Sequence, residues 1–412
     1  MALPLTHRLS TVALIWAVPL FVELSALARS VLLAWGIGVD NLGRALILAL
    51  SLRLAEMLSD IGLERMLQVS PRRYEADFIA ALHGASVLRG GATGLFLLAL
   101  ALPMSASFTD GASATSFAAL ALVPLLRGFL HLDYRCAEVR RNVLPMAIVE
   151  GMSALAMLAG LPLMVVLFGD ERAILGLVLL QTLAQVALSH LVASRRYALR
   201  IDTAILAQLW TFGAPLVVNA GLMFMAMQAD RFIVAGFYGW AEVAAYGVAF
   251  QLASLPAQIA GRAAASSLTA GLAGADGAQV LQKALRHYAL LAVGFAAGFA
   301  LAAPAAIGWV YGPAMQPNGV LALGLGLAAG LRILRTPLSV RAVALERTGD
   351  PARANLWRAA ALIPAVCAAA LGLPLAAIAG TAALGEAAAA WRAYQLLQAQ
   401  ALAPCPFVES PV

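Results

Sequence analysis

Apolar residues occur along the chain in long runs that short polar breaks separate. Crossing the hydrocarbon layer of a bilayer as an α-helix takes about 20 residues, and about twelve runs reach this length. Ala, Leu and Gly dominate the runs, which favours helices packed through small side chains over the alternating strands of a membrane β-barrel. The pattern therefore predicts an all-α polytopic membrane protein.

The expected spans form two groups of six. The first group lies within residues 1–200 and contains Thr11–Trp35, Leu42–Ile61, Phe78–Leu102, Ser113–Leu130, Val143–Phe168 and Ala173–Ala193. The second group lies within residues 201–402 and contains Phe212–Phe237, Ala241–Arg262, Tyr288–Tyr311, Val320–Ala342, Asn355–Leu373 and Leu375–Gln398. We expect each group to form one six-helix lobe, with a central cleft between the lobes. Residues 403–412 contain three prolines, and we expect them to form a disordered cytoplasmic tail.

Basic residues gather in every second break between the expected spans. These breaks hold Arg65, Arg72 and Arg73, then Arg135, Arg140 and Arg141, then Arg195, Arg196 and Arg200, then Lys283 and Arg286, and then Arg341, Arg347 and Arg353. The other breaks hold mostly acids: Asp40, Asp110, Asp170, Glu171 and Glu242. Because basic loops stay on the cytoplasmic side, both termini are predicted to be cytoplasmic. A polar leader, Met1–Ser10, without a cleavage site after it predicts an uncleaved signal anchor.

The composition agrees with a membrane protein. Hydrophobic residues make up 62% of the chain and charged residues 12%, and the mean hydropathy is +0.87. A net charge of +6 follows from the basic loops, so the charge does not indicate a nucleic-acid partner.

Sequence motifs of ATP, metal and redox chemistry are missing. The single lysine, Lys283, has no glycine loop around it, and neither His-Glu-x-x-His nor Cys-x-x-Cys occurs. The three cysteines and five histidines are scattered, so we expect ordinary packing or helix-end positions for them. Gly324, Gly326 and Gly330 resemble a dinucleotide fingerprint, but they lie inside an expected membrane helix, where glycines permit close packing. We expect no cofactor, no metal and no enzymatic activity.

Ionisable residues inside the expected spans are the main candidates for function. Each costs about 2.5 to 3.5 kcal/mol at mid-helix on insertion scales, so each should face protein or a water-filled cavity. They are Glu23, Arg29, Arg53, Glu56, Asp60, Arg89, Arg127, Glu150, Asp230, Arg231, Arg332, Arg335 and Glu386. For Arg127, Arg231 and Glu150, interhelical salt bridges or snorkelling to the interface are the expected roles.

Four arginines are candidates for binding a pyrophosphate, because a guanidinium group can hold phosphate oxygens through two parallel hydrogen bonds. They are Arg29, Arg53, Arg89 and Arg332. Four acids, Glu23, Glu56, Asp230 and Glu386, could neutralise these arginines or bind a coupling proton or sodium ion. The sequence leaves both roles open.

Two similar segments suggest an internal repeat between the halves. Arg29 is followed by Ser-Val-Leu-Leu-Ala-Trp-Gly on the way to Gly43, and Arg231 by Phe-Ile-Val-Ala-Gly-Phe-Tyr-Gly on the way to Gly247. Each segment joins the first expected helix of a half to its second. Parallel repeats of this kind are a transporter plan in which two bundles enclose a cleft.

Several segments resemble one family. They are Asp60-Ile61-Gly62-Leu63-Glu64-Arg65, then Gly128-Phe129 with Arg135, Arg140, Arg141 and Glu150, then Phe212-Gly213-Ala214-Pro215, Asp230-Arg231-Phe232-Ile233-Val234, Ala245-Tyr246-Gly247 and Leu255-Pro256. These segments are similar to the polysaccharide flippases, including the O-antigen flippases, of the multidrug/oligosaccharidyl-lipid/polysaccharide exporter superfamily. Ala245 stands where the family has glycine, and twelve helices is fewer than the fourteen of some members. The resemblance covers the chain to about Ser267 and is thinner afterwards.

The resemblance implies a flippase in the bacterial cytoplasmic (inner) membrane. Such a protein turns a lipid-linked oligosaccharide, carried on a polyprenyl pyrophosphate, from the cytoplasmic to the outer leaflet by alternating access. Its partners would be that substrate, membrane lipid and proteins of polysaccharide assembly. The alternatives are a multidrug or metabolite/cation antiporter of the same superfamily, a membrane glycosyltransferase or polymerase, and a transport-inactive relative. Short outer breaks disfavour the glycosyltransferase or polymerase.

Overall fold

The structure is a computed structural model that describes residues 5–108, 112–140, 142–274, 276–347 and 349–401. All regular structure in this part of the chain is helical. Residue contacts divide the chain into two compact units, Met1–Gly221 (unit 1) and Leu222–Val412 (unit 2). The expected lobes, 1–200 and 201–402, remain a prediction. Arg141 and the expected tail, residues 403–412, lie outside the described residues.

Unit 1 is built from long helices joined by short ones. In chain order these are α1 (Leu5–Ile37), α2 (Val39–Leu58), α3 (Leu63–Val69), α4 (Ala76–Ala106), α5 (Ala114–Ala119), α6 (Leu122–Arg127), α7 (Asp133–Val139), α8 (Leu144–Met146), the π-helical segment η1 (Ala147–Met152), α9 (Ser153–Phe168) and α10 (Arg172–Leu191). Helix α11 (Thr203–Gln228) begins in unit 1 and ends in unit 2. Helix α9 packs against α1 and α10, and α4 packs against α5 and α6.

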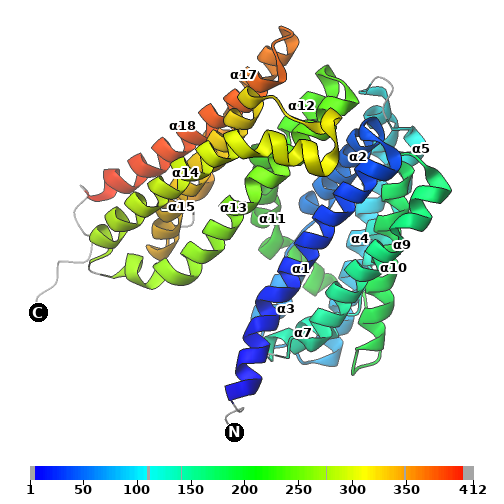
Figure 1. Ribbon diagram of the computed structural model, residues 1–412. Helices are drawn as coiled ribbons and strands as arrows, with labels where there is room; N and C mark the ends of the chain where they lie inside the picture. Colours follow the sequence, from blue (N-terminus) through cyan, green and yellow to red (C-terminus); the bar gives the residue numbers. More distant parts are fainter. Residues whose placement is uncertain (1–4, 109–111, 141, 275, 348, 402–412) are drawn as a thin grey trace, which may run out of the picture. The chain divides into compact units, whose positions relative to one another are not determined.

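Unit 2 continues with α12 (Asp230–Phe237), α13 (Trp240–Ala273), α14 (Gly277–Tyr311), the 3₁₀ segment η2 (Pro313–Met315), α15 (Gly319–Ala344), α16 (Gly349–Ala360), α17 (Leu362–Ala370) and α18 (Leu375–Ala401). Helix α15 is central because it packs against α13, α14 and α18. Figure 1 shows α14, α15 and α18 running side by side.

Small residues permit this packing. A Cβ atom at Gly330 would lie 2.7 Å from the carbonyl oxygen of Ala292 on α14, and one at Gly324 would lie 2.8 Å from the Cβ of Ala379 on α18. A carbon atom at such a distance overlaps the neighbouring oxygen or carbon atom, so only glycine fits at the two positions. The prediction that these glycines serve close packing is confirmed.

Eight helices in the described ranges are long and apolar enough to cross a membrane, judged by length and composition. They are α1, α8–α9 taken together, α4, α10, α11, α13, α14 and α15. The other four expected spans are also helical but fall short of these criteria. Helix α2 carries four charged residues, α18 is alanine-rich with two, and the remaining two are each split into short helices. The prediction of a polytopic all-α protein is confirmed.

Three expected spans are not continuous, which corrects the simple pattern of runs. Ser113–Leu130 is split into α5 and α6, Asn355–Leu373 into α16 and α17, and Phe212–Phe237 into the end of α11 and α12. Pro124 and Pro364 lie within the first turns of α6 and α17. A proline lacks the N–H that would bond to the preceding turn, so the helical hydrogen bonds break just before it.

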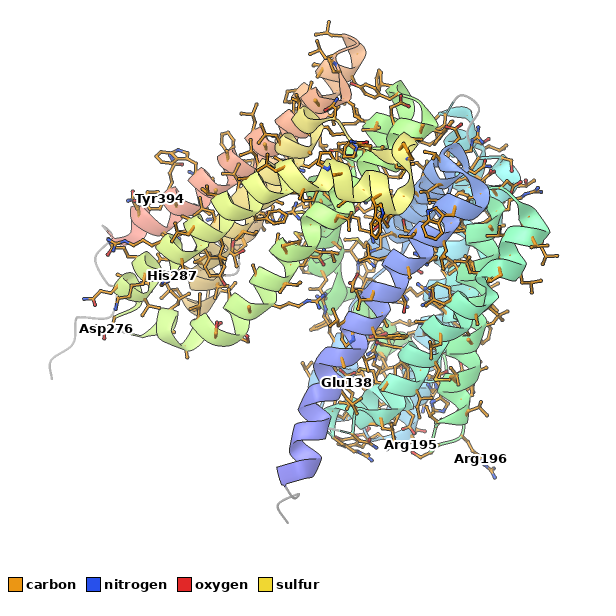
Figure 2. All side chains as sticks on the ribbon, viewed as in Figure 1. Glu138, Arg195, Arg196, Asp276, His287 and Tyr394 are labelled. Atoms are coloured by element: carbon orange, nitrogen blue, oxygen red, sulfur yellow. The ribbon has the colours of Figure 1, made fainter. Side chains whose placement is uncertain are left out.

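The arginine-rich breaks of unit 1 lie together at one end. Arg195 donates a hydrogen bond to the carbonyl oxygen of Tyr74 at 3.2 Å, and the Cys136 thiol donates to that of Arg73 at 3.5 Å. Glu138, Arg195 and Arg196 are seen at this end in Figure 2. In unit 2, Arg341 donates to the Leu272 carbonyl and Arg347 to the Leu396 carbonyl, each at 2.6 Å. Asp276, His287 and Tyr394 mark that end of unit 2 in Figure 2.

Candidate functional site

Unit 1 contains a polar cavity of about 540 Å³. Its walls come from α2, α3, α4, α6, α7, α10, η1 and the turn between α2 and α3. The charged lining residues are Arg53, Glu56, Asp60, Glu64, Arg65, Arg89, Arg127, Arg135 and Glu150. Five arginines against four acids leave a formal charge of only +1 in a space large enough for a polar head group. How each arginine is held therefore decides what the cavity can bind.

Helix α2 presents Arg53 and Glu56 from one face. The two residues are three apart, which places them on adjacent turns of the same side. The neighbouring side of α2 packs into unit 1 through Leu48, Leu52 and Ala55, each at most 5% exposed. Glu56 forms an ion pair with Arg127 of α6. The expected interhelical salt bridge of Arg127 is confirmed, and Glu56 neutralises Arg127 here.

Arg89 of α4 is held loosely. Its guanidinium lies 3.9 Å from the carboxylate of Asp60, in the turn between α2 and α3. Asp60 also accepts a hydrogen bond from the N–H of Gly62, whose φ of 71° lies in the left-handed region that favours glycine. This turn, part of the family-like segment, aims an acid at Arg89. A contact of 3.9 Å is too long for a hydrogen bond, so Arg89 keeps its donors for another acceptor.

Arg53 and Arg65 are the cavity arginines without an acid beside them. Both are exposed, and no carboxylate in the described ranges lies within 4.0 Å of either guanidinium. Arg65 is the third residue of the short helix α3, which begins directly after the Asp60–Gly62 turn. The sequence assigned Arg65 to a loop, and the structure places it in the cavity wall.

Arg135 of α7 is held by three acids. Its Nη2 lies 2.8 Å from Glu150, its Nη1 3.1 Å from Glu138, and its Nε 3.1 Å from Glu64. Burial lowers the pKa of Arg135, but Tyr134 and the carboxylates outweigh it and raise this pKa above its usual value. Arg135 is therefore a permanent cation whose charge the three acids offset.

Arg29 and Glu23, both on α1, do not line this cavity. The Arg29 guanidinium donates to the sulfur of Met157 on α9 at 3.2 Å. A thioether is a weak acceptor, so Arg29 retains most of its hydrogen-bonding capacity.

Arg332 and Glu386 lie together in unit 2. The Arg332 guanidinium contacts the Glu386 carboxylate at 3.0 Å, and Arg335 and Arg358 reach the same carboxylate at 3.4 Å. Glu386 is fully buried, and Arg358 is 1% exposed. Because a buried charge needs partners, this cluster fixes α15, α16 and α18 to one another. Arg358 lies within an expected span, and its charge among apolar residues was a signal that the sequence analysis missed.

Asp230 is also in unit 2, where the hydroxyl of Tyr246 donates to its carboxylate at 2.7 Å. Both residues are buried. The bond joins two of the family-like segments, Asp230–Val234 and Ala245–Gly247. Arg231 donates to Gln228 at 2.6 Å and stacks on Phe250. Asp230, Glu386 and Arg332 therefore lie in unit 2, and Arg53, Arg89 and Glu56 line the cavity of unit 1.

Three histidines converge although they are far apart in sequence, which corrects the view of them as scattered. The ring of His131 lies 4.9 Å from that of His83 and 5.4 Å from that of His190. They come from α4, α10 and the break between α6 and α7, which meet at the arginine-rich end. Within the described residues, no group of three His, Cys, Asp or Glu side chains is placed to hold a metal ion.

Comparisons with known proteins agree with this architecture. A family model described as "Polysaccharide biosynthesis protein" matches residues 32–317. Comparison of the sequence with curated proteins yields no match.

Solved structures with the same fold cover nearly the whole chain. The lipid II flippase MurJ in an inward closed conformation superposes with a TM-score of 0.75 at 12% identity, over 93% of this chain and 87% of MurJ. An inward-facing multidrug resistance MATE family transporter of the MOP superfamily gives 0.67 at 14% identity, over 93% and 96%. A MOP superfamily transporter from Pyrococcus furiosus, described as having a binding pocket of reverse polarity, gives 0.58 at 15% identity, over 95% of each chain.

The family match covers more than half of the chain, and the fold is shared with transporters along nearly its full length. The expectation of a transport protein and not an enzyme agrees with both findings. The chain belongs to the polysaccharide biosynthesis protein family and has the fold of the MOP superfamily.

Proposed function

We propose that the protein is a flippase that moves a polyprenyl-pyrophosphate-linked oligosaccharide from the cytoplasmic to the outer leaflet for surface polysaccharide biosynthesis. The observation that carries the proposal is the unit-1 cavity, in which Arg53 and Arg65 have no acid beside them among the described residues and Arg89 lies 3.9 Å from Asp60. Membership of the polysaccharide biosynthesis family supports a glycan-related cargo. The fold shared with the lipid II flippase MurJ supports a lipid-linked one.

The three available guanidinium groups would bind the pyrophosphate. Arg53 and Arg65 would each offer two parallel N–H donors to phosphate oxygens, and Arg89 would exchange its long contact with Asp60 for a direct hydrogen bond. The polyprenyl tail would remain in lipid. Arg29 and Arg332 remain candidates for later contacts, although Arg332 would first have to leave Glu386.

The proposed membrane arrangement has twelve spans in two six-helix lobes, residues 1–200 and 201–402, around a central cleft, with both termini cytoplasmic in a bacterial inner membrane. Clustering of the arginine-rich breaks at one end of each unit supports this orientation. The internal repeat that starts at Arg29 and Arg231 would relate the lobes. Contact with polysaccharide assembly proteins would occur on the membrane surfaces.

Energy for the movement would come from an ion gradient or from consumption of the product, because the sequence has no nucleotide-binding motif. Glu23, Glu56, Asp230 and Glu386 remain candidates for the coupling ion or for charge balance. Glu56 is paired with Arg127 and Glu386 with three arginines, so charge balance accounts for their contacts in this conformation.

The proposal is tested by deleting the gene and measuring lipid-linked oligosaccharide on each leaflet. We expect the precursor to accumulate on the cytoplasmic leaflet and surface glycan to fall, with recovery when the wild-type gene is returned. Surface glycan at the wild-type level without trapped precursor would refute the flippase.

A cation or metabolite antiporter is the second candidate, favoured by the fold shared with the MATE transporter. Such a protein needs acids free to bind a cationic substrate. In the unit-1 cavity each acid lies within 4.0 Å of an arginine. Drug resistance lost on deletion, with normal surface glycan, would favour this alternative.

A further inference from the structure

The three acids around Arg135 come from three separate elements. Glu64 is on α3, Glu138 on α7 and Glu150 on the π-helical segment η1. Each contacts a different nitrogen of one guanidinium, at distances between 2.8 and 3.1 Å. Glu64 and Glu150 also line the unit-1 cavity, so the cluster is part of its wall.

The charges in this cluster do not balance. One guanidinium group offsets one carboxylate, so three ionised carboxylates would leave two negative charges within a few ångströms. Like charges at such distances disfavour the ionised form of each other, and a group of this kind takes up a proton more readily than an isolated carboxylate. Glu150 is the least exposed of the three at 24%, so water screens it least.

The remaining groups that face the cluster cannot take up that proton. Tyr134 and Arg135 are both on α7. The other arginines that line the same cavity, Arg53, Arg65, Arg89 and Arg127, are cations and have no vacant position for a proton. Burial raises the pKa of Tyr134 above its usual value, so the phenol is already protonated at neutral pH. Arg135 is already a cation. Within the cluster, an added proton would therefore be held by the carboxylates.

We propose that Glu64, Glu138 and Glu150 form a proton-binding site that sets how much positive charge Arg135 offers to an anion in the unit-1 cavity. The inference rests on the proposed function for the anion, a pyrophosphate. With the cluster ionised, the acids hold Arg135. With one carboxyl protonated, that acid no longer attracts Arg135 electrostatically, and the charge of the cavity wall rises by one.

Proton and anion binding are then linked. A pyrophosphate diester carries more than one negative charge, whereas the formal charge of the cavity lining is only +1. Protonation of the cluster would strengthen anion binding, and by reciprocity anion binding would draw in a proton. Loss of the proton would weaken anion binding, which would favour release of the head group.

The proton site itself is tested by infrared difference spectroscopy of the purified full-length protein as the pH is lowered from about 8 to about 5.5. We expect a protonated-carboxyl C=O band that is lost in Glu150→Gln and reduced in Glu138→Gln. The matched control is Glu75→Gln, because Glu75 pairs with Arg72 outside the cavity and should leave the band unchanged. Folding of each variant is checked by its thermal unfolding midpoint.

The linkage is tested by calorimetry with a water-soluble dialkyl pyrophosphate diester, whose own groups stay ionised over this pH range. Binding heats in buffers of different ionisation enthalpy give the number of protons taken up. We expect wild-type protein and Glu75→Gln to take up as much as about one proton per anion and to bind about tenfold more tightly at the lower pH. In Glu150→Gln both effects should be lost while the anion still binds.

The outcomes separate this inference from the proposed function. Diester binding without proton uptake, or uptake that is unchanged in Glu150→Gln, would overturn the inference and leave the flippase intact. The inference would also be overturned if the protein showed no carboxyl band that depends on Glu138 or Glu150. A normal band with no diester binding to wild-type protein would instead overturn the pyrophosphate role of the cavity, and with it the link from proton to anion.

Discussion

Guanidinium groups in unit 1 differ in how tightly their neighbours hold them. Arg127 is paired with Glu56, Arg135 with three acids, and Arg89 only at 3.9 Å, whereas Arg53 has no acid beside it among the described residues. Removing a paired arginine leaves a carboxylate uncompensated, which costs stability. Removing an unpaired arginine leaves no carboxylate uncompensated. Arg53 is therefore the position at which binding can be separated from folding.

We predict that Arg53→Ala impairs flipping with little change in stability. Loss of hydrogen bonds to a charged ligand group should weaken pyrophosphate binding by about 1.5 to 3 kcal/mol. Diester affinity by calorimetry and flipping in proteoliposomes measure this loss. The control is Arg196→Ala, which removes an exposed arginine at the end of unit 1 outside the cavity. Equal transport in Arg53→Ala and Arg196→Ala would contradict the role of Arg53.

The contribution of His131 to stability is expected to depend on pH. Its Nδ1 accepts the N–H of Asp133 at 3.2 Å and its Nε2 donates to the Arg195 carbonyl at 3.1 Å, so both nitrogens are used by the neutral ring. Burial lowers the pKa of His131, and Asp133 offsets this only in part. The folded pKa lies below that of the unfolded chain, about 6.5. The stability from His131 is therefore complete above about pH 6.5 and is lost as the pH falls below it.

The thermal unfolding midpoint should fall as the pH is lowered from about 7.5 to about 5.5, across the unfolded pKa. His131→Asn should unfold at a lower temperature at about pH 7.5 and show a weaker dependence on pH. The control, His287→Asn at an exposed position of unit 2, should keep the wild-type dependence. An equally steep dependence in His131→Asn would show that other groups cause it.

Helix α4 depends on small residues to approach its neighbours. A Cβ at Gly90 would lie 2.3 Å from the carbonyl oxygen of Pro124 on α6, which is backbone and cannot turn away. The adjacent Gly91 has no atom within 4 Å of such a Cβ. Because Arg89 precedes Gly90, the same contact that joins α4 to α6 fixes where Arg89 stands in the cavity wall.

We predict that Gly90→Ala destabilises unit 1 by about 1 to 3 kcal/mol through overpacking, and that it also weakens diester binding because Arg89 moves. The same change at Gly91 adds no clash and should be neutral or slightly stabilising, since alanine favours the helix. Thermal unfolding and diester binding of the two variants provide the comparison. Similar midpoints for both would mean that α4 and α6 pack less closely than described.

The sequence predicted helix positions well because long apolar runs reflect a single strong constraint, the thickness of the bilayer. It could not predict that Ser113–Leu130 divides into α5 and α6, since a proline within a membrane helix breaks some helices and only bends others.

The sequence pointed to Arg53 and Arg89 because a charged residue is costly in lipid. Arg65, Glu64 and Glu138 carry no such signal, because they lie in segments where charge is ordinary. The convergence of His83, His131 and His190 depends on which helix ends meet, and spacing along the chain does not contain that information.

At the scale of the whole molecule, the contacts bear on how many helices cross the membrane. With only the eight long apolar helices crossing, α2 would not span, and residues 70–75 would lie on the opposite side from residues 192–202. The hydrogen bond between Arg195 and the Tyr74 carbonyl places both segments at the same end of unit 1. With twelve spans, α2 crosses and both segments fall on the cytoplasmic side. The contact therefore supports the twelve-span arrangement.

Single cysteines can test this arrangement in cells after the three natural cysteines are replaced. Val69, Ser107 and Arg196 are exposed positions at helix ends or breaks of unit 1. With twelve spans and cytoplasmic termini, a membrane-impermeant maleimide should label Ser107→Cys in intact cells and should reach Val69→Cys and Arg196→Cys only after permeabilisation. The eight-span arrangement predicts the reverse for Val69 and Ser107 and the same result for Arg196, so Arg196→Cys is the internal control. Labelling of Val69→Cys in intact cells would exclude α2 as a membrane span. It would also contradict the proposal that Arg53, on α2, binds the head group at the cytoplasmic leaflet.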